Sequence, residues 1–248
     1  MPTGIIRQAH RRYENLFFSG MVGLFLVFVF IGFARTYYLA GLFRAPLPNF
    51  LLHIHGAVFS AWILLLIAQT SLVAAHRIHL HRRLGLLGFG LACLMVVLGL
   101  LAAADQLTRH TANNDTETVE DVRAFYAVPL TDILMFATFV YLGYRNRLQP
   151  PVHKRFMLFA TLAILDVAFD RWPVFATVSL PMVHIICFVP LILLLIGYDW
   201  WSTGRIQRVT FWSSAALVVV QQARHPIGHF AWWQSFAAWV AAHTPSFR

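Results

Sequence analysis

Two histidines stand at the start of a long apolar segment of this chain, His53 and His55 in NFLLHIHGAVFSAW. Neutral imidazole is a good ligand for iron, zinc or copper, and an ionisable group in apolar surroundings is costly enough to suggest a function. On a helix, one face carries residues that recur every seven positions: His55, Trp62, Gln69 and His76. His53 lies about 160° around the helix from His55, so the two histidines predict separate roles. We expect His55 to face the interior and His53 to lie against a neighbouring helix.

Other ionisable groups fall at a similar depth on other apolar segments. Asp132 in VPLTDIL and His184 in LPMVHIICF each lie about one turn from the segment start. If these segments pack together, one half of a bundle collects the following residues: His53, His55, Asp132, Asp166, His184 and His229. Arg35 and Arg171 are available as counter-charges. The alternative is a set of separate ion pairs and helix caps.

Composition shows which elements must position these residues. The chain is 59% hydrophobic, only 12% charged, and has a mean hydropathy of +0.66, which is typical of a membrane protein. We expect an all-α fold, a polytopic transmembrane helical bundle, forming a single membrane domain over residues 1–248. The expected spans are 14–42, 50–76, 82–104, 126–146, 154–173, 180–200 and 209–224, followed by a short interfacial helix at 228–243. We expect Pro226 to break the helix between His225 and His229.

The distribution of charge predicts the orientation. With a cytoplasmic amino terminus, the inner segments hold twelve Lys and Arg residues against two acids, as the positive-inside rule requires. The net charge of +9 is therefore assigned to topology and to anionic lipid headgroups, and nucleic acid is not an expected partner. We expect a bacterial inner (plasma) membrane location. The segment 105–125 is expected to be an outer acidic loop, either solvated or a docking surface for a partner.

A weak internal repeat joins HRRLGLLGF (81–89) and HKRFMLFAT (153–161), each of which opens an outward-going helix after a basic turn. We expect His81 and His153 to be interfacial anchors in the wet inner loops, together with His76 and His79. The secondary hypothesis is that these histidines bind a cofactor.

Three resemblances follow from these motifs. The HRR.G and HKR helix starts with Arg171-Trp172-Pro173 resemble a group of uncharacterised bacterial multi-pass proteins, for which no activity is established. The histidines near span ends look more loosely like transmembrane b-type cytochromes, although that family places its ligand histidines inside the spans. A histidine in the second span with His225 and His229 near the seventh is similar to membrane zinc hydrolases of the ceramidase and adiponectin-receptor type.

The leading hypothesis is membrane electron transfer with a b-type haem held by His53 or His55 and His184. A second hypothesis is a zinc or non-haem iron site whose ligands come from His55, Asp132, Asp166, His184 and His229, which would suit a hydrolase. A third is a non-catalytic accessory subunit of a respiratory or photosynthetic complex, with no cofactor of its own and with quinone, lipids or other subunits as partners. The three hypotheses leave open whether the chain is an enzyme.

Overall fold

The computed structural model describes residues 2–45, 49–113, 118–175, 177–178 and 180–245, and within them the chain forms helices and no strand. The expected all-helical class is therefore confirmed. The elements follow in chain order as α1 (Pro2–Phe33), a π-helical segment (Ala34–Tyr38), α2 (Ala40–Phe43), α3 (Phe50–Ala74), α4 (Ile78–Asn113), α5 (Val119–Phe125), α6 (Ala127–Arg145), α7 (Pro150–Ala163), α8 (Asp166–Phe169), a 3₁₀ turn (Pro173–Phe175), α9 (Leu180–Thr203), α10 (Arg208–Gly228) and α11 (Ala231–His243).

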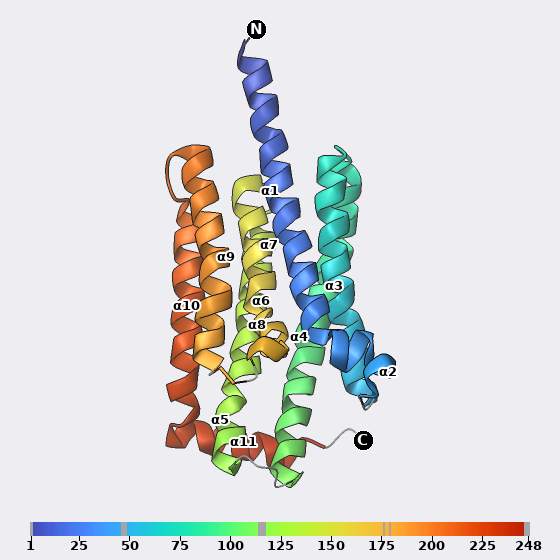
Figure 1. Ribbon diagram of the computed structural model, residues 1–248, viewed down its shortest axis with the longest axis vertical. Coiled ribbons are helices and arrows are strands. Elements are labelled where there is room, and N and C mark those ends of the chain that lie inside the picture. Colours follow the sequence, from blue (N-terminus) through green and yellow to red (C-terminus); the bar gives the residue numbers. More distant parts are fainter. Residues whose placement is uncertain (1, 46–48, 114–117, 176, 179, 246–248) are drawn as a thin grey trace.

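The long helices run side by side, and α11 lies across one end of the bundle (Figure 1). The amino terminus and the carboxyl terminus lie at opposite ends. We call the end that carries the amino terminus the amino end and the end that carries α11 the carboxyl end. The turns between α3 and α4, α6 and α7, and α9 and α10 all lie at the amino end (Figure 1).

Local signals explain where several helices begin. The Asn49 side chain caps α3 by accepting a hydrogen bond of 2.8 Å from the Leu52 amide, and Thr118 caps α5 in the same way. Pro150 occupies the first turn of α7, where its missing N–H costs nothing.

His76 has a φ of 58°, so it lies in the left-handed region just after α3 ends. That turn removes His76 from the expected stripe, and its side chain is exposed.

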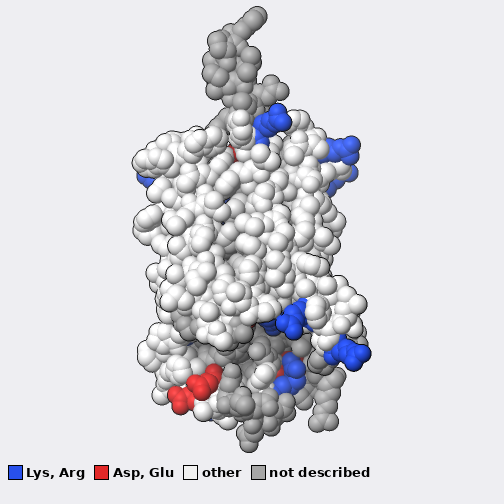
Figure 2. Space-filling view, viewed as in Figure 1, with Lys and Arg blue, Asp and Glu red and all other residues white. Residues whose placement is uncertain are grey.

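Within the described residues, five segments are long and apolar enough to cross a membrane: Arg12–Tyr38, Phe50–Ala74, Ile78–Thr111, Val119–Arg145 and Ile185–Thr203. Figure 2 shows a broad uncharged belt on the visible face, with charged residues gathered towards its two ends. Such a belt is expected of a multi-pass membrane protein.

The expected spans 154–173 and 209–224 are not among these five segments. The first is divided, because α7 has only 14 residues and the chain is interrupted before α8 begins at Asp166. The second corresponds to α10, which is long enough at 21 residues but is too polar, with Gln221 and Arg224 on its buried face. Both helices nevertheless pack in the bundle against α6.

Large apolar side chains fill the centre of the bundle. Phe25 on α1, Met95 on α4, Phe136 on α6 and Phe159 on α7 are buried in one continuous cluster. Gly32 allows α1 to approach α8, because a Cβ at this position would overlap the Ala168 backbone. The core therefore fixes α1, α4, α6, α7 and α8 closely against one another.

The segment 105–125 differs from the expected acidic loop. Helix α4 continues to Asn113, and α5 begins at Val119. Asp105 is buried, and its carboxylate accepts a hydrogen bond of 3.1 Å from the Asn49 amide and pairs with Arg109 at 2.9 Å. Because Asp105 and Arg109 are one helical turn apart, this ion pair supports helix rather than loop. Residues 114–117 lie outside the described ranges.

Candidate functional site

Two aspartates from different elements share one buried arginine near the carboxyl end of the bundle. The Arg224 guanidinium on α10 donates from Nη1 to Asp132 on α6 at 2.5 Å and from Nη2 to Asp166 on α8 at 2.7 Å. Arg224 is 1% exposed, and both carboxylates are buried as well. A buried charge is tolerated only where it is paired and hydrogen-bonded, so this cluster joins α6, α8 and α10.

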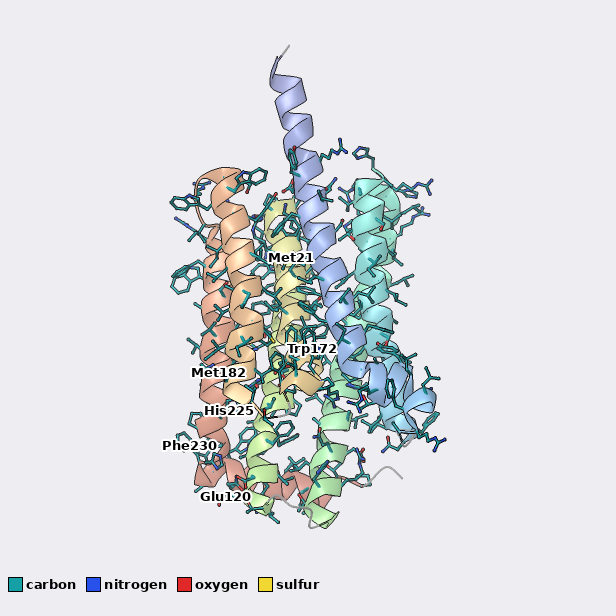
Figure 3. The ribbon with its side chains drawn as sticks, in the orientation of Figure 1. Met21, Glu120, Trp172, Met182, His225 and Phe230 are labelled. Atoms are coloured by element: carbon teal, nitrogen blue, oxygen red, sulfur yellow. The ribbon has the colours of Figure 1, made fainter. Side chains whose placement is uncertain are left out.

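The positive group that pairs with these two aspartates is not the one that the sequence predicted. Arg35 and Arg171 were the expected partners, but Arg35 lies over the Phe43 ring and Arg171 lies over the Phe33 ring. Arg171 also donates to the Val167 carbonyl at 2.7 Å. Arg224 lies next to His225 (Figure 3) on α10, and this helix continues through Pro226 to Gly228, so the expected break at Pro226 is wrong. Proline removes only one hydrogen bond in that last turn, and the helix ends two residues later.

The expected outer-half histidines are dispersed. His53 is exposed beside the Tyr37 ring, whereas the His55 ring stacks on Phe59 with centroids 4.1 Å apart. His229 is half exposed, with Nδ1 3.6 Å from the Glu120 carboxylate. His184 lies on α9, and its side chain is outside the described part of the structure.

The metal hypothesis had named His55, Asp132, Asp166, His184 and His229. Of these, the structure brings together Asp132 and Asp166, and it does so through Arg224. Among the described residues, no group of three or more His, Cys, Asp or Glu side chains could hold a metal ion. The Arg224 guanidinium takes one oxygen atom of each carboxylate and already places a positive charge between them. The described geometry therefore gives a zinc or non-haem iron site no support.

The helical stripe on α3 leads to a second site at the amino end. Trp62 is buried, and its indole donates to the Thr161 hydroxyl on α7 at 3.1 Å. Two turns further on, the Gln69 side-chain amide lies 2.7 Å from His81 Nδ1 on α4. Trp62 and Gln69 were expected to face the bundle interior. The histidine that Gln69 meets there is His81 rather than His55.

His81 and His153 face each other from the first turns of α4 and α7. Their ring centroids are 6.3 Å apart, and the ring planes are inclined at 82°. Both rings are partly buried. The two helix starts that form the internal repeat in the sequence are therefore brought together in space.

Each of these histidines is anchored through Nδ1. The His153 Nδ1–H donates to the Gly143 carbonyl at 2.8 Å, and this leaves the Nε2 lone pair available. For His81, the Gln69 amide satisfies the neighbouring backbone best when its nitrogen donates to Nδ1. Turning the amide over would present its oxygen to an Nδ1–H instead, so Gln69 can serve either tautomer of His81. A hydrogen bond at Nδ1 is the usual way to orient a histidine that binds a metal through Nε2.

Basic residues follow both histidines, and they differ in their partners. Arg82 and Arg83 on α4 are exposed. On α7, Lys154 pairs with Glu14 of α1, and the buried Arg155 pairs with Asp199 of α9. The α7 cations therefore hold neighbouring helices, whereas the α4 cations are free to meet an anionic group at the surface.

Comparison with known proteins found no matching family model, no similar curated protein and no similar solved structure. The function must therefore be argued from these side chains.

Proposed function

We propose that the chain is an integral membrane electron-transfer protein that binds a b-type haem between His81 and His153. The observation that carries this proposal is the opposition of two imidazoles from two helices at 6.3 Å. Two metal–nitrogen bonds of about 2 Å each, together with the half-widths of the two rings, give a separation of about 6 Å. The ring spacing thus fits one iron atom bound by both histidines.

The surrounding residues suit this role. Gly143 would orient the His153 ring by accepting from its Nδ1–H, and Gln69 would orient His81 with its side-chain oxygen turned towards Nδ1–H, so that both Nε2 lone pairs would be available to the iron. The exposed guanidinium groups of Arg82 and Arg83 could pair with the two propionates of haem b. The bound haem would supply a one-electron redox couple, and the protein residues would orient it and set its surroundings.

We propose a quinone as the electron partner. An apolar groove of about 400 Å³ between α1 and α9 is lined by Tyr13, Leu16, Phe17, Gly197, Tyr198 and Trp201. The ion pair of Glu14 with Lys154 connects this groove to the residue that follows His153. Aromatic rings with a few polar groups are typical walls for a planar, amphipathic ligand.

The number of membrane spans and the orientation of the bundle are part of the same proposal. We infer that α7 and α10 cross the membrane with the five apolar segments, so that the bundle has seven spans. The amino end, with its basic turns, would lie in the cytoplasm of a bacterial cell, and the haem would lie near that membrane surface.

The test is an absorption spectrum of the protein purified in detergent, with and without added haemin. We expect a Soret band that shifts on reduction with dithionite and is lost in His81→Ala and His153→Ala. His79→Ala is the matched control, because His79 is exposed on the same turn of α4 and should keep the band. Size-exclusion chromatography checks that each variant remains folded.

Two results would overturn the proposal. The first is a blank spectrum from folded wild-type protein after haemin addition. The second is a band that persists in both His81→Ala and His153→Ala but is lost in His55→Ala or His184→Ala, which would move the haem to the other half of the bundle. Elemental analysis of a colourless protein would then show whether zinc or iron binds without haem.

A further inference from the structure

A pocket of about 140 Å³ lies between α4, α5 and the beginning of α6. These helix ends meet near the carboxyl end of the bundle, where α11 crosses it (Figure 1). The starts of α4 and α7, which carry His81 and His153, lie at the opposite end. The pocket also shares no lining residue with the groove between α1 and α9. It is therefore separate from the haem site and the quinone groove proposed above.

Three polar side chains line this pocket: Gln106 and His110 of α4, and Tyr126 between α5 and α6. Gln106 and His110 are one helical turn apart, so they share a face of α4. Tyr126 is only 6% exposed. Within the described part of the chain, none of the three side chains forms a hydrogen bond with another protein group. A buried hydroxyl without a protein partner is unfavourable unless water or a ligand supplies one.

The Tyr126 ring is held in place by α11. Its centroid lies 6.0 Å from that of Trp233 and 6.4 Å from that of Phe236. The Trp233 indole also donates to the Arg123 carbonyl of α5 at 2.9 Å, which fixes α11 against α5. The hydroxyl, the polar atom of the Tyr126 side chain, is thus positioned before any ligand arrives, and binding needs little further ordering.

Most of the remaining lining is apolar. Leu107, Val122, Phe125 and Pro129 face the same space, and no Asp, Glu, Lys or Arg is found among the described lining residues. Such walls favour an uncharged ligand whose apolar surface displaces water. Because an apolar cavity of about 150 Å³ can hold benzene, the pocket of about 140 Å³ has room for one six-membered ring.

We propose that this pocket binds a single phenolic ring, an uncharged six-membered ring that carries a hydroxyl group. The phenol hydroxyl would accept a hydrogen bond from the Tyr126 hydroxyl and donate one to the Gln106 amide oxygen or to a His110 ring nitrogen. The ring would pack against Phe125 and Leu107. Such a ring comes either from a small free phenol or from the head group of a membrane quinol. The proposal does not depend on haem binding at the other end of the bundle.

The experiment is a ¹⁹F NMR titration of 4-fluorophenol against the full chain in lipid nanodiscs, with empty nanodiscs as the reference for partition into lipid. We expect saturable binding to the protein. The probe 4-fluorotoluene has nearly the same shape but carries a methyl group in place of the hydroxyl, so it should bind about fivefold more weakly. An isoprenoid quinol in the lipid distinguishes the two sources: displacement of 4-fluorophenol assigns the pocket to a membrane quinol, and retention assigns it to a free phenol.

Two variants locate the binding. Tyr126→Phe keeps the ring packed against α11 and removes only the hydroxyl, whereas Gln106→Leu removes the amide. We expect each to weaken 4-fluorophenol binding by about fivefold, which is typical for the loss of one hydrogen bond. Tyr141→Phe is the matched control, because Tyr141 is exposed on α6 and is not among the described lining residues. Size-exclusion chromatography checks that each variant is folded.

Three results would overturn the proposal. The first is the absence of saturable binding to folded wild-type protein. The second is equal affinity for 4-fluorophenol and 4-fluorotoluene, which would show that the polar groups do not recognise the ligand. The third is unchanged affinity in both Tyr126→Phe and Gln106→Leu, which would place the bound phenol elsewhere on the protein.

Discussion

His81 on α4 and His153 on α7 oppose each other with ring centroids 6.3 Å apart, although they are separated by more than seventy positions in the sequence. Each ring is held at Nδ1 by a group from a different helix, Gln69 of α3 or Gly143 of α6. Residues from four helices thus meet at this pair of imidazole rings. This convergence gives the first prediction.

If His81 and His153 hold a haem as proposed, replacing His153 by methionine should keep this haem and raise its reduction potential. A thioether ligand stabilises reduced haem iron more than imidazole does, as His/Met ligation does in cytochromes c. A redox titration followed at the absorption maximum measures the change. His153→Ala should instead lose the spectrum, and an unchanged potential in His153→Met would mean that residue 153 is not an axial ligand.

Replacing Arg224 should destabilise the bundle strongly. The Arg224→Met variant leaves Asp132 and Asp166 buried without their partner, which we expect to lower the free energy of unfolding by about 3–5 kcal/mol. Unfolding in mixed detergent micelles measures this change. The triple variant R224M/D132N/D166N has no buried charge in the cluster, and it should recover most of the loss; equal losses in both variants would show that packing rather than charge dominates.

Two glycines on α1 form a matched pair for a packing prediction. Gly32→Ala should cost about 1–3 kcal/mol, because the added Cβ would overlap the Ala168 backbone, which cannot move aside easily. Gly23→Ala meets no atom within 4 Å and should be neutral or stabilise by up to about 1 kcal/mol through helix propensity. Thermal unfolding of the two variants compares them directly. A similar melting temperature for both would contradict the close approach of α1 and α8.

Asn49 caps the start of α3 and also contacts Asp105 of α4. Two substitutions distinguish the contributions of these two contacts to stability. Asn49→Ala removes both the cap and the contact with Asp105, at a cost of about 0.5–2 kcal/mol. Asn49→Asp keeps a capping oxygen but places a second carboxylate beside Asp105. We expect the stability of Asn49→Asp to improve as the pH falls and that of Asn49→Ala to be less sensitive; chemical unfolding at two pH values checks this.

Some of these relationships could be read from the sequence. The long apolar runs predicted an all-helical chain, and comparison of depth placed Asp132 and Asp166 at a similar level. The repeat of HRR and HKR marked the starts of two helices. These predictions succeed because apolar length and helix periodicity are local properties of the chain.

The rest depended on long-range packing. Nothing local shows that α10 continues past Pro226, and Arg224, the last residue of the expected span 209–224, was not connected with the two aspartates. The inner histidines were interpreted as separate anchors because a repeat gives the positions of helix starts but not their convergence. Likewise, Asn49, which donates a hydrogen bond to the buried Asp105 carboxylate, lies 56 positions away in the sequence.

The buried face of α10 also has a consequence for the order of assembly. As a membrane-spanning helix, the role proposed above, α10 would gain too little from lipid to insert alone, because it carries Gln221 and Arg224, and it would enter the bilayer against helices that already supply carboxylates. Both aspartates precede Arg224 in the chain and are synthesised first. During biogenesis α10 would therefore pack after α6 and α8, against the Asp132 and Asp166 carboxylates that these helices already present.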